Sequence, residues 1–452
     1  MYDLIVIGGG PAGYLGAERA AQAGLAVALI EKAVLGGVCL NEGCVPTKTL
    51  LYSAKILDNA RHGDEYGVKI NDASIDHAAV IARKDKVVKT LVGGVSATMA
   101  KLKIKVYSAE ATITRRIAGG FEVRAGNEMI SGARLLIATG SMPVIIPVPG
   151  VQEGYAAGFV LTNKEALSLP ELPQSICVIG GGVIGLEMAS YFNSCGCKVT
   201  VVEMLDRVGG ATDQKIAGIL MKIYQKKGIE FFLEAKVTAV KPGEVVFEKN
   251  GQTMAVQADK VLLSTGRKAV TQNLGLENIG VEVERGAIKT DNTGRTSCLN
   301  VYAAGDVNGK YMLAHAAYRE AEVCVNNMVG KKDLMRYEAV PSVIYTNPEV
   351  ASVGHSEESA KALGLDVEVR EVSMLLSGRY LAENTGEKGI CKLVLEKGSN
   401  RIVGVQMVAN YASEIIYGAA LMIEMQLCVE DVKELIFPHP TVGEVVREVL
   451  FL

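Results

Sequence analysis

The sequence lacks several features that would place it in other classes of protein. It has no long run of one charge sign, and its 47 basic and 50 acidic residues give a formal net charge of −3. A chain so balanced has no electrostatic footprint for nucleic acid or for an anionic membrane. No stretch reaches the roughly 18 uncharged apolar residues of a membrane span, and the apolar region 419–429 is interrupted by Glu424. We therefore expect neither nucleic acid nor membrane as a partner.

The N-terminus also lacks the basic segment of a secretion signal, and its first apolar run ends in glycines. The nine cysteines are an odd number. Without a secretion signal, such a count argues against a framework of structural disulfides. We predict a cytoplasmic protein in which any disulfide is catalytic.

Length and composition indicate a globular protein of several domains. At about 150 residues per domain, the 452 residues correspond to roughly three domains. Apolar residues make up 49% and charged residues 21% of the chain, which excludes a disordered or fibrous protein. Glycine is enriched, with 49 residues.

Two segments repeat one pattern, in which a short apolar run leads into Gly-x-Gly-x-x-Gly and then into a helical stretch. A second apolar run follows and ends in a glutamate 23 positions beyond the first glycine. The first copy contains Gly8, Gly10, Gly13 and Glu31, and the second contains Gly180, Gly182, Gly185 and Glu203. The glycines permit a tight turn and the approach of a pyrophosphate to a helix N-terminus, while the acid binds ribose hydroxyls. We predict two dinucleotide sites; the alternative is two glycine-rich turns in ordinary α/β packing.

Both copies close alike, in IATGS and LSTGR, but the first copy is longer by about 46 residues. These extra residues follow Glu31 and contain Cys39 and Cys44. A protein with two dinucleotide folds has two redox carriers to connect. We therefore interpret the cysteine pair as a candidate third carrier.

Two other interpretations of this pair are core cysteines and half of a metal site. No second CxxC or clustered histidines accompany it, so zinc is not expected. Five residues apart on a regular helix, two Cα atoms lie roughly 8–9 Å from each other, whereas a disulfide needs less than about 7 Å. Bonding thus requires a local distortion, for which Gly43 gives freedom, and Pro46 suits the first turn of a following helix.

Cys44 is therefore expected at a helix N-terminus, where the helix dipole lowers a thiol pKa and favours the thiolate. The seven other cysteines lie in apolar or helical stretches, and we assign them to packing. They are Cys177, Cys195, Cys197, Cys298, Cys324, Cys391 and Cys428.

The segment GGVCLNEGCVPTK, at 36–48, resembles the flavoprotein disulfide reductases of the pyridine nucleotide class. Further motifs of this class occur in the family order along nearly the whole chain: GGGPAGY, IATGS, GGGVIGLE, STGRK, VYAAGDV with MLAHAA, VPSVIYTNPEVASVG and HPTVGE. Within the class the chain is most similar to the dihydrolipoyl dehydrogenase branch.

The resemblance implies FAD on the first copy and NAD on the second. It places Asp306 at the flavin ribityl chain and Lys48 with Glu187 as a charged pair near the flavin. It makes Cys44 the thiol that faces the flavin and Cys39 the thiol that exchanges with substrate. The implied FAD-binding residues are Gly8, Gly10, Gly13, Glu31, Lys48, Thr139, Gly140, Asp306, Ala314 and His315. The implied NAD-binding residues are Gly180, Gly182, Gly185, Glu187, Glu203 and Gly266.

The residues around Glu203 favour NAD over NADP. A carboxylate at the end of this strand repels a 2′-phosphate, and the next three residues, Met204, Leu205 and Asp206, offer no arginine to bind one. Arg207, one position further on, keeps NADP open.

His439 and Glu444 lie five residues apart near the C-terminus. A lone histidine is usually structural, but dithiol chemistry needs a base near neutral pH, and a carboxylate would orient its ring. By resemblance, this pair comes from the partner subunit of a homodimer. Lipoamide enzymes often carry another histidine where this chain has Phe437, which leaves substrate specificity open. The remaining histidines, His62, His77 and His355, are expected at surface or loop positions.

We predict an α/β protein with two Rossmann-like dinucleotide-binding domains and a C-terminal α+β dimerisation domain. The FAD domain comprises 1–145 and 266–338, the NAD domain 146–265 and the interface domain 339–452. The last domain is expected to contain a hairpin within 391–409 and a helix near 413–426. Apolar helical faces there suit a symmetric interface.

The implied activity is oxidation of protein-bound dihydrolipoamide to lipoamide through a Cys39–Cys44 disulfide and FAD, with reduction of NAD⁺ to NADH. The lipoyl-bearing partner would be the E2 component of a 2-oxoacid dehydrogenase or the H protein of glycine cleavage, and the sequence does not distinguish them. One alternative is a related disulfide reductase or transhydrogenase with another substrate. The other is a non-catalytic, nucleotide-sensing scaffold.

Overall fold

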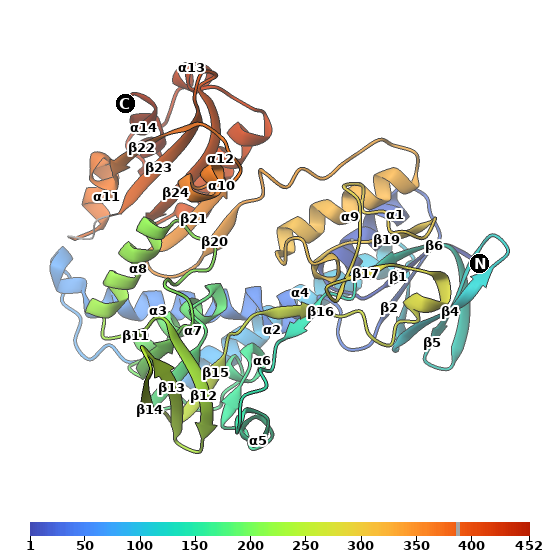
Figure 1. Cartoon of the computed structure of the whole chain (residues 1–452), viewed down its shortest axis with the longest axis horizontal. Coiled ribbons are helices and arrows are strands. Elements are labelled where there is room, and N and C mark those ends of the chain that lie inside the picture. Colours follow the sequence, from blue (N-terminus) through green and yellow to red (C-terminus); the bar gives the residue numbers. More distant parts are fainter. Residues whose placement is uncertain (386–388) are drawn as a thin grey trace. The chain divides into compact units, whose positions relative to one another are not determined.

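The computed structural model describes residues 1–385 and 389–452, which form two compact units (Figure 1). The first unit consists of Met1–Thr49, Ile81–Val144 and Gly266–Met335. The second consists of Leu50–Val80, Ile145–Thr265 and Arg336–Leu452. The chain therefore leaves the first unit and returns to it twice.

The first unit is built on a sheet whose strands near the N-terminus are parallel and whose other edge is an antiparallel meander. Its order is β3 (Lys105–Ser108), β2 (Val27–Glu31), β1 (Tyr2–Ile7), β6 (Glu128–Ile137), β5 (Gly120–Ala125) and β4 (Ala111–Ile117), with β19 (Val301–Ala303) also pairing β6. A turn at Ala118-Gly119 joins β4 to β5. This arrangement of parallel strands is the one that a dinucleotide fold requires.

Successive residues of β1 enter two different cores, because side chains alternate across a strand. Leu4 and Val6 pack on the side of α1 (Pro11–Gln22) and α9 (Ala314–Met328), which lie against each other (Figure 1). Ile5 and Ile7 pack on the opposite side, with residues of β5 and β6. At β1 the sheet is thus buried on both faces, as parallel sheets are.

The extra residues of the first copy follow Glu31, as the sequence predicts, and in the structure they are mainly helical. They contain α2 (Gly37–Glu42), α3 (Cys44–Arg61), the 3₁₀ turn η1 (Gly63–Tyr66) and α4 (His77–Lys101), all between β2 and β3. The division between the two units falls within α3 and within α4.

The rest of the first unit consists of short elements around the return of the chain. These are β7 (Ser141–Pro143), β16 (Arg267–Ala269), η2 (Leu276–Ile279), β17 (Val283–Glu284), β18 (Ala287–Ile288) and η3 (Asp306–Asn308). β7 and β16 form an antiparallel ribbon, and β17 and β18 form another.

In the second unit, the second glycine-rich copy forms a parallel sheet with a separate three-stranded meander. The sheet has the order β11 (Glu230–Phe232), β10 (Lys198–Val202), β9 (Ser175–Ile179), β15 (Lys260–Leu263) and β8 (Val160–Leu161). The meander consists of β12 (Ala235–Lys241), β13 (Glu244–Lys249) and β14 (Gln252–Gln257). The helices of this part are α5 (Val151–Ala156), α6 (Asn163–Ala166), α7 (Val183–Ser194) and α8 (Gln214–Lys226).

The C-terminal part of the second unit is an antiparallel sheet with helices. The sheet has the order β20 (Ser342–Ile344), β21 (Glu349–Gly354), β24 (Arg401–Ala409), β23 (Ile390–Glu396) and β22 (Val367–Ser373). The helices are α10 (Glu357–Ala362), η4 (Met374–Leu376), α11 (Gly378–Glu383), α12 (Ala412–Glu424), α13 (Val429–Lys433), η5 (Val442–Glu444) and α14 (Val445–Leu450). The expected hairpin is β23 with β24, and the expected helix is α12. The α/β fold class with a C-terminal α+β part is confirmed.

The surface position expected for His77 is wrong. This residue begins α4 and is buried, with Nδ1 2.9 Å from the Tyr191 hydroxyl and Nε2 3.0 Å from the Leu169 carbonyl oxygen. Both partners are about a hundred residues away in the sequence, so no local pattern signals the contact. His62 is exposed, as expected.

Within the described residues, no helix combines the length and the apolar character that crossing a membrane would require. The same residues contain no group of three or more His, Cys, Asp or Glu side chains arranged to hold a metal ion.

Candidate active site

The first glycine-rich turn connects β1 to α1 and is held by Glu31 at the end of β2. Glu31 Oε2 accepts a hydrogen bond from Gly9 N at 2.6 Å, and Oε1 accepts one from Ala33 N at 2.7 Å. A Cβ on Gly13 would lie 1.8 Å from the Gly8 carbonyl oxygen, so only glycine permits this close packing of helix on strand. α1 begins after Gly10, and no side chain of the described residues caps it.

The second copy repeats these contacts between β9, α7 and β10. Glu203 Oε2 accepts from Gly181 N at 2.5 Å, and Oε1 accepts from Leu205 N at 2.8 Å. A Cβ on Gly185 would lie 2.2 Å from the Gly180 carbonyl oxygen.

The glycine-rich turns therefore fit dinucleotides. Both helices begin with uncapped backbone N–H groups, which suit the charge of a diphosphate. A carboxylate has about four lone-pair positions, so Glu31 and Glu203 can each hold the backbone of the turn and still accept a ribose hydroxyl. Arg207 Nε lies 3.3 Å from Asp206 Oδ1, and this ion pair offsets the charge of the arginine closest to Glu203 in sequence.

The cysteine pair lies where the helix is interrupted, as the sequence predicts. Cys39 belongs to α2, Cys44 begins α3, and Gly43 between them has the non-helical angles φ −143° and ψ −112°. Both residues are thiols in the structure, with Cys44 exposed and Cys39 partly buried. The hydrogen bond to Cys44 and then burial raise the pKa of the Cys39 thiol, while the Lys48 ammonium opposes them. The two sulfurs are therefore neighbours.

A pair of tyrosines that the sequence analysis did not identify lies close to these cysteines. The hydroxyls of Tyr14, in α1, and Tyr318, in α9, are 2.5 Å apart. Burial raises the pKa of both phenols above the ordinary value, and negative charge on Cys39 and Cys44 raises it further. The tyrosines are 304 residues apart, so only the packing of α1 on α9 brings them together.

A second group that the sequence analysis missed surrounds Asp306, the residue expected at the flavin ribityl chain. The Ser141 hydroxyl donates to Asp306 Oδ2 at 2.5 Å, and Arg267 Nε donates to Ser141 Oγ at 2.7 Å. Ser141 and Arg267 directly follow the Thr-Gly pairs that close the two copies of the repeat. This equivalent position in the two copies is the sequence signal that could have identified them.

The remaining residues expected to bind FAD also lie in the first unit. Thr139 Oγ1 donates to the Val270 carbonyl at 2.6 Å, and Val270 N donates to the Gly140 carbonyl at 3.0 Å. Ala314 and His315 are the first residues of α9.

The residues expected to bind NAD are divided between the units. Glu187 is buried in α7 of the second unit, and its Oε1 accepts from Tyr345 N at 3.0 Å. Gly266 belongs to the first unit, where its carbonyl accepts from Val144 N at 3.0 Å. The charged pair of Lys48 with Glu187 stays a prediction, since the two residues belong to different units.

His439 and Glu444 are in contact in the second unit. His439 Nδ1 lies 2.7 Å from Glu444 Oε2, and the side chains are 78% and 12% exposed, respectively. Thr441 Oγ1 accepts from Glu444 N at 3.2 Å and donates to the Pro438 carbonyl at 2.9 Å, which fixes the turn. A carboxylate on Nδ1 assigns the ring proton to that nitrogen, so Nε2 is left to accept a proton. Phe437 packs partly against the C-terminal core.

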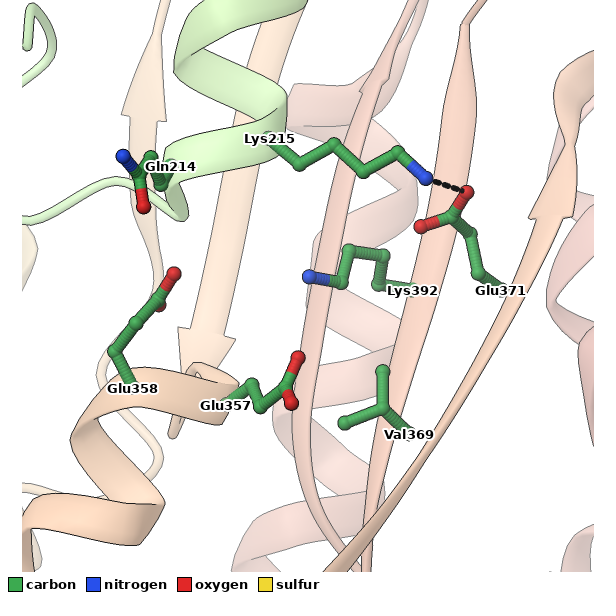
Figure 2. Close-up of a pocket in the computed structure, with 7 residues that line it drawn as sticks. All are labelled: Gln214, Lys215, Glu357, Glu358, Val369, Glu371 and Lys392. Atoms are coloured by element: carbon green, nitrogen blue, oxygen red, sulfur yellow. Dashed lines mark hydrogen bonds and ion pairs between the residues drawn. The ribbon is translucent and has the colours of Figure 1, made fainter.

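The second unit also contains an open cavity of about 610 Å³ between α8, α10 and the sheet strands β22 and β23 (Figure 2). It is lined by Gln214, Lys215, Glu357, Glu358, Val369, Glu371 and Lys392. Lys215 Nζ and Glu371 Oε1 form an ion pair of 2.5 Å across it. None of the residues predicted to be functional lines this cavity.

Comparison with known proteins gives matches along the whole chain. Residues 2–321 match the family model described as pyridine nucleotide-disulphide oxidoreductase, and residues 340–450 match the dimerisation domain of that family. The chain is 37% identical to the dihydrolipoyl dehydrogenases of Mycoplasma pneumoniae and Bacillus subtilis, covering 99% of this chain and 97% of each relative. It is 36% identical to the mitochondrial dihydrolipoyl dehydrogenase of Pisum sativum, covering 99% of this chain and 90% of the relative.

Among solved structures, the HOCl-induced flavoprotein disulfide reductase RclA from Escherichia coli matches with a TM-score of 0.86 and 28% identity, covering 100% of both chains. LpdA from Mycobacterium tuberculosis has the same fold, with a TM-score of 0.90, 24% identity and 99% of both chains covered. The chain therefore belongs to the pyridine nucleotide-disulphide oxidoreductases, a family of flavoprotein enzymes that use FAD and NAD(H).

Proposed function

We propose that this chain is a dihydrolipoyl dehydrogenase, which oxidises protein-bound dihydrolipoamide and reduces NAD⁺ to NADH. The observation that carries the proposal is the neighbouring pair Cys39 and Cys44 at a helix break, in a chain whose relatives of 35–38% identity bear this name. A dithiol substrate needs such a pair, because two electrons must pass between sulfurs by thiol–disulfide exchange.

The exchange starts from the oxidised pair, Cys39–Cys44. One sulfur of dihydrolipoamide gives its proton to a base and attacks Cys39 Sγ, and the S–S bond breaks with Cys44 leaving as the thiolate. The second substrate sulfur then displaces Cys39 from the mixed disulfide, and its proton passes to the leaving Cys39 sulfur. The products are the cyclic disulfide of lipoamide and the reduced pair, so two electrons and two protons have left the substrate.

We assign the base to His439, with Glu444 as the residue that positions it. The 2.7 Å contact of Nδ1 with Glu444 supports this assignment, because it leaves Nε2 as the proton acceptor. Cys44 at the first position of α3 has the electrostatic environment that favours a thiolate leaving group. Bound FAD supplies two-electron transfer between the reduced pair and NAD⁺.

We propose that the enzyme is a homodimer in which the partner subunit contributes His439 and Glu444. The matched dimerisation domain supports a dimer. So does an apolar stripe along α12 and the residue that caps it. Its members, Tyr417, Leu421 and Met425, are four residues apart and 75%, 50% and 62% exposed.

We also propose the FAD domain at 1–145 and 266–338, the NAD domain at 146–265 and the interface domain at 339–452. Divisions between the compact units at 144/145, 265/266 and 335/336 support these boundaries. We propose a cytoplasmic enzyme, tested by fractionation, whose partner is the lipoyl domain of an E2 component or a glycine cleavage H protein.

The test is NADH formation by the FAD-loaded protein with free dihydrolipoamide as the donor. Glutathione as the donor and NADPH-driven reduction of disulfides are the controls. We expect Cys44→Ser to abolish NADH formation, whereas Cys428→Ser, at a partly buried cysteine outside the pair, retains it. Turnover by Cys44→Ser at the wild-type rate would refute the mechanism.

If the protein binds flavin but forms no NADH from dihydrolipoamide, a related disulfide reductase with another substrate would be favoured. The 28% identity to RclA and the presence of Phe437 are the observations that favour this second function.

A further inference from the structure

The two closing segments of the internal repeat meet in the first unit, at the ribbon of β7 and β16. Ser141 follows Thr139-Gly140 in the first copy, and Arg267 follows the equivalent Thr-Gly pair in the second. In the ribbon, Ser141 pairs with Ala269 and Arg267 pairs with Pro143. The first side chain after the closing glycine of the second copy therefore lies in the unit that carries the first copy.

Arg267 is held to this ribbon by two hydrogen bonds. Nε donates to Ser141 Oγ at 2.7 Å, and Nη2 donates to the Ser141 carbonyl at 2.9 Å. Ser141 is 6% exposed, and its hydroxyl in turn donates a hydrogen bond to Asp306 Oδ2 at 2.5 Å. A hydroxyl can accept and donate at once, so these bonds form one directed chain from the guanidinium to the carboxylate.

The guanidinium also lies within electrostatic range of the cysteine pair. Burial lowers the pKa of Arg267, and the negative charges of Asp306, Glu42 and the Cys44 thiolate act in the opposite direction. Because a guanidinium keeps its charge in proteins, Arg267 presents a permanent positive charge to Cys44. A fixed cation beside a thiol favours its thiolate.

We propose that Arg267 is a positioning residue of the redox site, which fixes the Asp306 carboxylate through Ser141 and keeps a positive charge within electrostatic range of the Cys44 thiol. The proposal rests on Cys39 and Cys44 being the redox pair. Arg267 is linked to the carboxylate expected at the flavin through Ser141, and its charge also acts on the thiol expected to face the flavin.

The test measures thiol reactivity rather than turnover. The reduced, FAD-loaded protein is alkylated with iodoacetamide from pH 5 to 10, and modification of Cys44 is followed by peptide mapping. For Arg267→Gln, a shift of about one pH unit in the midpoint makes alkylation below the midpoint about tenfold slower. Lys268→Gln is the matched control, because it removes the same charge from the neighbouring, exposed residue of β16.

Two further variants separate charge from geometry. Arg267→Lys keeps the charge but cannot make both bonds to Ser141, so we expect the wild-type alkylation profile and faster loss of FAD on dilution. Ser141→Ala keeps the guanidinium and its bond to the backbone carbonyl, so we expect the same two results.

The proposal is overturned if Arg267→Gln retains the wild-type profile, or if Lys268→Gln shifts it as far. It is also overturned if Arg267→Lys or Ser141→Ala shifts the profile as far as the glutamine variant does. If Arg267→Gln does not fold, Arg267→Lys still tests the proposal, because loss of FAD at the wild-type rate would overturn the positioning of Asp306 through Ser141. The alkylation uses no dithiol substrate, so failure of the dihydrolipoamide assay in the wild type would reject the proposed function without altering these outcomes.

Discussion

Replacing Glu444 with glutamine tests the assignment of the base most directly. The variant keeps the size of the side chain and an oxygen that can accept from His439 Nδ1, but it removes the negative charge. A hydrogen bond to a charged group contributes about 1.5–3 kcal/mol. The His439 side chain is 78% exposed, and solvent screens such contacts, so we take the lower limit of about 1.5 kcal/mol.

That loss corresponds to about a tenfold decrease in kcat/KM for dihydrolipoamide. His439→Gln removes the base itself, and we expect a decrease of about a hundredfold or more. The assay is steady-state NADH formation at several dihydrolipoamide concentrations. Glu448→Gln is the matched control, since this glutamate is 40% exposed on α14 and pairs with Arg447.

Two results would refute the reasoning. One is an activity of Glu444→Gln within twofold of the wild type while His439→Gln is impaired, because the carboxylate would then not assist the base. The other is an equal decrease in Glu448→Gln, which would indicate a general effect of charge.

Three further predictions concern buried or partly buried groups of the second unit. His77→Ala removes the ring that bonds the Leu169 carbonyl and one of the two partners of the buried Tyr191 hydroxyl, which keeps its bond to Cys195. With the loss of the buried ring, we expect the free energy of unfolding in urea to fall by about 2–4 kcal/mol, against about 0.5 kcal/mol or less for the exposed His62→Ala. Lys392→Met leaves the fully buried Asp213 without its ion-pair partner at 2.5 Å; we expect a loss of about 3–5 kcal/mol in the same measurement, and a loss below 1 kcal/mol would contradict it. Burial raises the pKa of the Cys195 thiol to about 12, so this thiol stays protonated at pH 8; peptide mapping should find it unmodified by iodoacetamide in the native protein, and rapid modification there would contradict the burial.

The sequence by itself determined the features that depend on short stretches of backbone. Glycine spacing predicts both dinucleotide turns, because a side chain at Gly13 or Gly185 would collide with the carbonyl of the first glycine of its turn. The separation of Cys39 from Cys44, with Gly43 between them, predicts a broken helix for the same kind of reason, since helix geometry forbids the approach of the two sulfurs. The β23–β24 hairpin follows from two apolar runs around a short polar turn.

Only the tertiary structure decided which distant side chains meet. Arg267 and Ser141 are 126 positions apart, and a two-stranded ribbon formed by the return of the chain joins them. His77 begins a helix with an unremarkable pattern, yet its ring is buried against Tyr191, 114 positions away. Such contacts leave no periodic signal in the sequence, because they depend on where whole elements pack and not on the residues next to them. The sequence therefore marks the backbone of the site, whereas packing selects the charges and hydroxyls that surround it.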